Sequence, residues 1–145
     1  MNEVPLQKKR ILFLTTHNAA RSQIAEGFIN AMYNDHYVAF SAGSEPTSVH
    51  PCVVRVMEEV GVDLGSQDAK SVDRFEGVHF DYVVSLCADD EERCPVFPAG
   101  AVHLQHAFPN PITAIEQDGE ACTPVREARD HIREWLEATF GGDTI

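Results

Sequence analysis

Short apolar runs alternate along the chain with segments whose apolar residues recur at helical spacing. Residues 11–14 form a continuous apolar run, which is typical of a strand buried on both faces of a parallel sheet. A polar loop from Thr15 to Arg21 follows, and apolar residues three and four positions apart then predict a helix over 21–33. A strand, a tight polar loop and a helix together form an arrangement that suits phosphate binding.

The rest of the chain repeats this alternation. The remaining predicted elements are strands at 37–40, 81–86 and, more weakly, 102–105, and helices at 53–60 and 123–140. Gly61 predicts the end of the first of these helices. Thr123 is the expected N-cap of the last helix and Pro124 its first helical residue. The proline-rich segment that follows residue 105 is expected to be a loop.

This order of elements predicts a single α/β domain over residues 1–145. We expect a doubly wound, four-stranded parallel sheet with helices on both faces. In such a sheet the ligand site lies at the carboxyl ends of the strands. The chemistry is therefore expected in the loops that begin near residues 15, 41, 87 and 106.

Composition and charge narrow the choice of partner. The 145-residue chain has a net charge of −12, so its overall field repels nucleic acid and anionic membranes. An anionic ligand would have to be held by short-range contacts in a shaped pocket. The apolar run at 11–14 is too short for a signal peptide or a membrane span, and we expect a cytoplasmic monomer.

The four cysteines, Cys52, Cys87, Cys94 and Cys122, are expected to be reduced or redox-active, because no signal peptide accompanies them. No Cys-x2-Cys or His-x3-His pair occurs, so no metal site is predicted. No cofactor is expected either.

The loop carries a recognisable motif. The segment 11–28, ILFLTTHNAARSQIAEGF, resembles the phosphate-binding loop of low-molecular-weight protein tyrosine phosphatases and thioredoxin-coupled arsenate reductases, whose signature is Cys-x5-Arg-Ser after the first strand. Arg21 and Ser22 match that signature. Similarity also covers Ser41-Ala-Gly-Ser44 and residues 56–64, and extends over about 10–111. A plain helix-capping loop is the alternative for the local sequence, and the extended match disfavours it.

The resemblance implies an oxyanion site made of backbone amides and a helix N-terminus, closed by the forked guanidinium of Arg21. It implies that Asn18 braces the loop and that Ser22 lies beneath the nucleophile. The expected oxyanion-binding residues are Thr15, Thr16, His17, Asn18, Ala19, Ala20, Arg21 and Ser22. Phosphate, arsenate and sulfate are the expected ligands.

A second segment, SLCADDEERCPVF at 85–97, resembles the redox segment of the thioredoxin-coupled arsenate reductases. In those enzymes the first thiol attacks a cysteine–arsenic adduct, and the second completes a disulfide that thioredoxin reduces. Cys87 and Cys94 occupy these places, which makes thioredoxin the expected partner. Cys52 and Cys122 match nothing functional in the family and are expected to be structural.

Two positions depart from the pattern. Thr15 stands where the nucleophilic cysteine belongs, and its hydroxyl is far less acidic than a thiol and has no general base in the motif. Asn110 stands where the family has the aspartate that protonates the leaving oxygen, and an amide cannot deliver a proton as a carboxyl does. Asp89, Asp90 and His106 are alternative acids. Natural divergence is favoured over engineering, because engineered replacements of the nucleophile are usually serine or alanine.

Three functions follow. The first is an arsenate reductase in which Arg21 binds the oxyanion and Cys87 and Cys94 supply electrons. The second is a catalytically silent module that binds or senses an oxyanion or a phosphorylated residue. The third, a tyrosine phosphatase of low activity, leaves the two thiols without a role. Oxyanion binding is common to all three.

Overall fold

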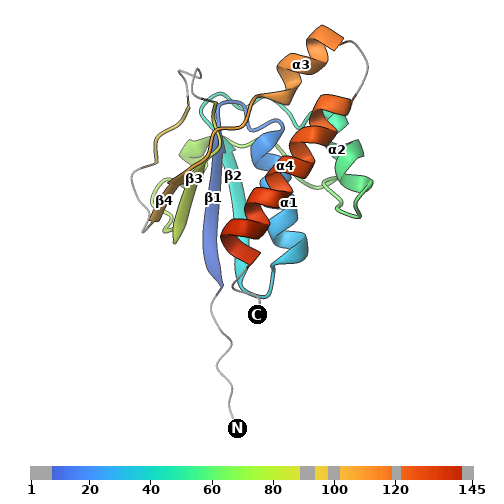
Figure 1. Ribbon diagram of the computed structural model, residues 1–145. Helices are drawn as coiled ribbons and strands as arrows, with labels where there is room; N and C mark the ends of the chain where they lie inside the picture. The colour runs from blue at the N-terminus through green and yellow to red at the C-terminus, as the bar shows by residue number, and fades with distance from the viewer. Residues whose placement is uncertain (1–7, 89–93, 98–101, 119–121, 142–145) are drawn as a thin grey trace.

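The computed structural model describes residues 8–88, 94–97, 102–118 and 122–141. Its centre is a parallel sheet with strand order β2-β1-β3-β4 (Figure 1). The strands are β1 (Lys9–Thr15), β2 (Tyr37–Gly43), β3 (Tyr82–Ser85) and β4 (Val102–Gln105). The helices are α1 (Arg21–Met32), α2 (Pro51–Glu58), α3 (Pro111–Asp118) and α4 (Thr123–Phe140), with a 3-10 helix η1 (Val72–Phe75). The predicted four-stranded parallel sheet is confirmed.

Helices α1, α2 and α4 lie on the same side of the sheet (Figure 1). Successive side chains of a strand point to opposite faces, so Ile11 and Phe13 of β1 join the helices while Leu12 and Leu14 face the other way. Ile24 and Phe28 of α1 enter the same core from one face of that helix. Among the described helices none is both long and apolar enough to cross a membrane.

The second face of the sheet is covered by η1 and by aromatic rings. Phe40, Phe75, Phe80 and Phe97 meet edge to face, with neighbouring ring centroids 5.5 to 5.7 Å apart. Such offset contacts add to the hydrophobic gain of burying the rings. This aromatic cluster closes the sheet where no long helix is described.

The proline-rich segment is not only a loop. Pro111 begins α3, a helix that the sequence reasoning missed because proline was taken as a sign of irregular structure. Proline is favoured in the first turn of a helix, where its missing N–H costs nothing. The predicted cap of the last helix is also wrong, since Thr123 is already helical and Cys122 is the N-cap. Gly61, with φ +82, follows α2 closely, in agreement with its predicted role.

Cys52 and Cys122 form a disulfide, with their Cα atoms 5.5 Å apart. The expectation of reduced thiols is therefore wrong for this pair. The bond joins the first turn of α2 to the residue before α4, two segments 70 positions apart in sequence. Sequence spacing alone gave no sign that these two thiols meet.

Candidate functional site

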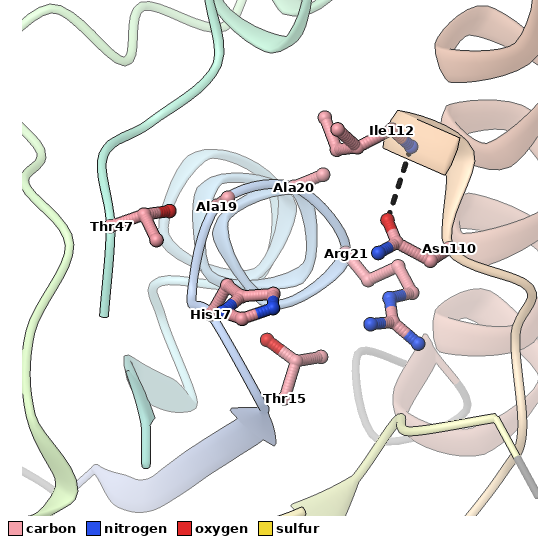
Figure 2. Close-up of a pocket in the computed structure, with 8 residues that line it drawn as sticks. All are labelled: Thr15, His17, Ala19, Ala20, Arg21, Thr47, Asn110 and Ile112. Carbon is pink, nitrogen blue, oxygen red and sulfur yellow. Dashed lines mark hydrogen bonds between the residues drawn. The ribbon is translucent and has the colours of Figure 1, made fainter. Parts of the chain in front are cut away.

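A pocket of about 180 Å³ lies at the carboxyl ends of the strands. Residues from three separate loops line it, namely Thr15, His17, Ala19, Ala20, Arg21, Thr47, Asn110 and Ile112 (Figure 2). Those segments follow β1, β2 and β4, and the chain leaving β3 contacts the guanidinium of Arg21. The pocket therefore lies at the edge of the sheet where a doubly wound fold places its ligand.

The backbone of the loop is oriented by segment 45–50. The amides of Glu45, Thr47 and His50 donate to the carbonyls of Thr16, His17 and Ala19 at 2.8, 3.1 and 3.1 Å. In a trans peptide the following N–H points opposite to the carbonyl. The amides of residues 17, 18 and 20 therefore point away from segment 45–50. Amides turned to one side of a loop form a concave group of donors that suits an anion.

Asn18 holds the turn of this loop. Its φ of 52 lies in the left-handed region, which asparagine tolerates better than most residues. Its Nδ2 donates to Ser22 Oγ at 2.8 Å, and its Oδ1 accepts from the backbone amide of Lys70, also at 2.8 Å. Gln23 Nε2 donates to both oxygens of Asn18. The completely buried Asn18 thus ties the loop to α1 and to the segment before η1.

Thr15 lies on the floor of the pocket, where its side chain is held by two partners. Its Oγ1 accepts from the amide of Asn18 at 3.2 Å and lies 2.8 Å from Ser22 Oγ. Either hydroxyl of this pair can be the donor. One arrangement has Ser22, which also accepts from the Asn18 side-chain amide, donating its hydrogen to Thr15 Oγ1. In that arrangement the hydroxyl hydrogen of Thr15 is directed elsewhere, and the pocket that Thr15 lines is the available direction.

Arg21 is buried at the start of α1, with 3% of its surface exposed. Its Nη1 donates to the carbonyls of Phe108 and Leu86 at 2.9 and 3.2 Å, which fixes the guanidinium beside the pocket. The helix has no side-chain hydrogen bond at its N-cap, Ala20, and no acidic residue in its first turn. The positive end of the helix dipole is thus left for a ligand.

Asn110 lies opposite the loop and directly precedes α3. Its Oδ1 accepts from the backbone amide of Ile112 at 3.1 Å, as the dashed line in Figure 2 shows. A backbone amide needs an acceptor, so this bond assigns the oxygen and leaves Nδ2 on the side of Arg21. Asn110 therefore presents a neutral donor to the pocket.

Cys87 and Cys94 form the second disulfide, with their Cα atoms 6.1 Å apart. Cys87 directly follows Leu86, whose carbonyl binds Arg21, so the disulfide is one peptide unit from a contact of this pocket residue. Ser85 Oγ lies 3.2 Å from Cys94 Sγ. The expected redox pair is thus within bonding distance.

A buried ionic cluster supports the loop from behind. Glu26 of α1 contacts the hydroxyl of Ser41 and pairs with Lys70 at 3.5 Å. Burial raises the pKa of the Glu26 carboxyl, and the positive charge of Lys70 opposes that shift. Because Lys70 also binds Asn18 through its backbone, the cluster connects α1 and β2 to the turn of the loop.

Comparison with known proteins agrees with this geometry. The profile of the family described as low molecular weight phosphotyrosine protein phosphatase matches residues 10–136. The chain belongs to this family. An arsenate reductase of Halalkalibacterium halodurans is 35% identical over 127 residues, which is 88% of this chain and 91% of that protein.

Solved structures of the family agree as well. An arsenate reductase in the phosphate binding state has a TM-score of 0.77 at 27% identity, over 92% of this chain and 98% of that one. A thioredoxin-dependent arsenate reductase of Corynebacterium glutamicum has a TM-score of 0.64 at 26% identity. It is matched over 93% of this chain and 63% of that one.

The structure brings together most of the site residues that the sequence predicted. Thr15, Arg21, Ser22 and Asn110 all lie at or beside the pocket. Thr16 is not among the residues that line it, and its carbonyl binds Glu45 instead.

Of the alternative acids, His106 lies in the described part of the chain. Asp89 and Asp90 lie outside the described residues. His106 packs its ring against Phe108 and Trp135, with centroids 4.5 and 5.3 Å apart, and does not line the pocket.

Sequence reasoning missed three residues that shape the site. Thr47, in the segment after β2, and Ile112, in the first turn of α3, line the pocket from positions that depend on the tertiary fold. A Cβ atom on Gly43 would lie 2.5 Å from the carbonyl oxygen of Thr16, so only glycine fits behind the loop. The Ser-Ala-Gly sequence, which forms the end of β2, was the available signal for Gly43.

Proposed function

We propose that this chain binds a tetrahedral oxyanion, phosphate or arsenate, in loop 15–22 as a binding or sensing protein. We further propose that it lacks the cysteine-dependent turnover of its relatives. The observation that carries the proposal concerns two positions of the pocket. Where the family pattern has a cysteine and an aspartate, this chain has neutral residues that can donate hydrogen bonds. Thr15 and Asn110 keep hydrogen-bonding groups at those positions and carry no negative charge.

Affinity for an anion follows from this change. A thiolate on the floor of the pocket repels a bound dianion, whereas a threonine hydroxyl can donate to it. The amides of residues 17 and 20, the guanidinium of Arg21 and the side-chain amide of Asn110 supply further donors, whereas the backbone amide of Asn18 is bonded to Thr15 Oγ1. Arginine binds tetrahedral oxyanions through two parallel bonds.

The same change removes turnover. Hydrolysis or reduction in the family pattern begins with attack by a thiolate, and Thr15 Oγ1 is instead a buried hydroxyl beside Ser22 and Asn18. No carboxylate is among the residues that line the pocket in the described part of the chain. The described residues of the pocket thus include neither the nucleophile nor the acid of the family pattern.

We propose that the Cys87–Cys94 disulfide is the redox element of the protein and that thioredoxin is its reductant. The bonded pair and its position one peptide unit from an Arg21 contact support this. The thioredoxin dependence in the name of the Corynebacterium relative supports the choice of partner.

Calorimetric titration of the full chain with inorganic phosphate and arsenate tests the binding proposal. The parent should bind both anions, and Arg21→Ala should weaken binding about 10- to 100-fold, as expected for losing charge-assisted bonds worth about 1.5–3 kcal/mol. Arg133→Ala is the matched control, because it removes the same charge from the exposed side of α4. Absent binding, or equal effects of the two substitutions, would contradict the proposal.

Arsenate reduction is the second candidate, favoured by the redox pair. Arsenate-dependent oxidation of thioredoxin should be undetectable for the parent and should appear in Thr15→Cys. Turnover by the parent would overturn the silent assignment. An aryl phosphate assay tests the phosphatase alternative in the same way, with no hydrolysis expected.

A further inference from the structure

His17 places an imidazole in a pocket whose other polar side chains can all donate hydrogen bonds. Those side chains are the hydroxyls of Thr15 and Thr47, the guanidinium of Arg21 and the amide of Asn110. The binding of a tetrahedral anion by backbone amides and an arginine requires no imidazole. The chemistry of His17 therefore needs its own explanation.

The hydrogen bond of the ring assigns its tautomer. Nδ1 of His17 lies 3.0 Å from the backbone carbonyl oxygen of Glu45. A carbonyl oxygen can only accept, so Nδ1 carries the hydrogen, and in the neutral ring Nε2 is left with an unprotonated lone pair.

The direction of that lone pair follows from the ring. The two nitrogens of an imidazole point in widely different directions, so Nε2 faces away from the carbonyl of Glu45. Figure 2 shows the ring lying above the Thr15 hydroxyl, between Thr47 and Arg21. Nε2 is thus an acceptor within a pocket of donors.

We propose that His17 selects oxyanions that carry a hydrogen, a statement that rests on the oxyanion-binding function proposed above. Monohydrogen phosphate and monohydrogen arsenate each have one hydroxyl that can donate to Nε2 while their other oxygens accept from the loop. Sulfate has no hydrogen to give and sets an oxygen against the lone pair. A site that pairs a ligand hydroxyl binds the analogue that lacks it less tightly, because the half-buried imidazole nitrogen then faces a second acceptor.

Calorimetry at pH 8 and constant ionic strength, with inorganic phosphate, arsenate and sulfate, tests the selection. The parent should bind phosphate and arsenate at least tenfold more tightly than sulfate. In His17→Ala the affinity for phosphate should fall, while the affinity for sulfate should stay within about twofold of the parent's. The ratio of phosphate affinity to sulfate affinity should therefore approach one. His103→Ala is the matched control, since His103 lies on β4 outside this pocket, and it should keep the ratio of the parent.

A second variant keeps the shape of the ring. His17→Phe retains a ring and removes both nitrogens, so the ratio of phosphate affinity to sulfate affinity should approach one, as in His17→Ala. The same calorimetric titrations measure this ratio.

The outcomes separate this inference from the function on which it rests. Equal affinity for phosphate and sulfate, both lost in Arg21→Ala, would overturn the role of His17 and leave the oxyanion site standing. Absence of binding by any of the three anions would overturn both proposals together. If His17→Ala and His17→Phe kept the parent's ratio of phosphate affinity to sulfate affinity, the selectivity would belong to the loop and not to the imidazole.

Discussion

Nη1 of Arg21 donates to the backbone carbonyl of Leu86, the residue that directly precedes Cys87. The guanidinium that lines the pocket and the disulfide are therefore joined through one peptide unit. A change in the redox state of the disulfide can then reach the anion through the position of this carbonyl.

We predict that reduction of Cys87–Cys94 weakens phosphate binding severalfold. Release of Cys87 from its partner removes one restraint on the peptide unit whose Leu86 carbonyl holds the guanidinium, while the amide of Phe108 still binds that carbonyl. Linkage is reciprocal, so a tenfold difference in affinity would lower the reduction potential of the pair by about 30 mV in saturating phosphate. Titration calorimetry with and without reductant measures the effect.

Two double variants serve as controls for this prediction. Cys52→Ser with Cys122→Ser should respond to reductant as the parent does. Cys87→Ser with Cys94→Ser should bind at the level of the reduced parent and should not respond. A response that disappears instead in the first double variant would place the coupling at the other disulfide.

Asn110→Asp should weaken phosphate binding about tenfold, or about 1.4 kcal/mol. The new carboxylate can still accept from the amide of Ile112 and cap α3, while its second oxygen sets a negative charge beside the ligand. Asn34→Asp, on the exposed turn after α1, adds the same charge away from the pocket and should change affinity little. Equal binding by Asn110→Asp and the parent would contradict the placement of the Asn110 amide.

Gly43→Ala should lower stability by about 1–3 kcal/mol and weaken phosphate binding as well. The added methyl would lie 2.5 Å from the carbonyl of Thr16 and 3.0 Å from the amide of Asn18, and backbone atoms cannot turn aside as a side chain can. Urea unfolding and phosphate titration measure the two effects. Gly61→Ala is the comparison, because it has open space but a φ of +82, and it should lose stability without losing affinity.

The ion pairs of Glu59 make the free energy of unfolding depend on pH. Arg126, and then Arg129, hold the pKa of the Glu59 carboxyl at about 2, below its ordinary 4.5. A lowered carboxyl pKa contributes stability that is fully present above pH 4.5 and is lost as the pH falls toward 2. Glu59→Gln should unfold at lower urea concentration at neutral pH and show a smaller loss between these limits. Glu58→Gln, an exposed neighbour, should keep the slope of the parent.

The sequence predicted those parts of the fold that depend on local pattern. The apolar run at 11–14 marked the buried strand, and the weaker pattern at 102–105 located β4 at its observed bounds. The start of α3 was missed, because Pro111 fits both a loop and the first turn of a helix and only the Asn110 cap decides between them.

The site was predictable as far as the motif reaches. Arg21 and Ser22 follow from a contiguous signature. Thr47 and Ile112 enter the pocket because distant strands end at one edge of the sheet, which no local pattern records. The pairing of Cys52 with Cys122 has the same origin, since it depends on where α2 and α4 meet in the core.

The Cys52–Cys122 bond turns the backbone between these residues into a closed covalent ring. The ring includes Leu86, Phe108 and Asn110, whereas loop 15–22 lies on the tail that precedes it. A protease that cut one peptide bond anywhere inside the ring would leave a single covalently connected molecule under non-reducing conditions. Both walls of the pocket would therefore stay attached to each other after such a nick.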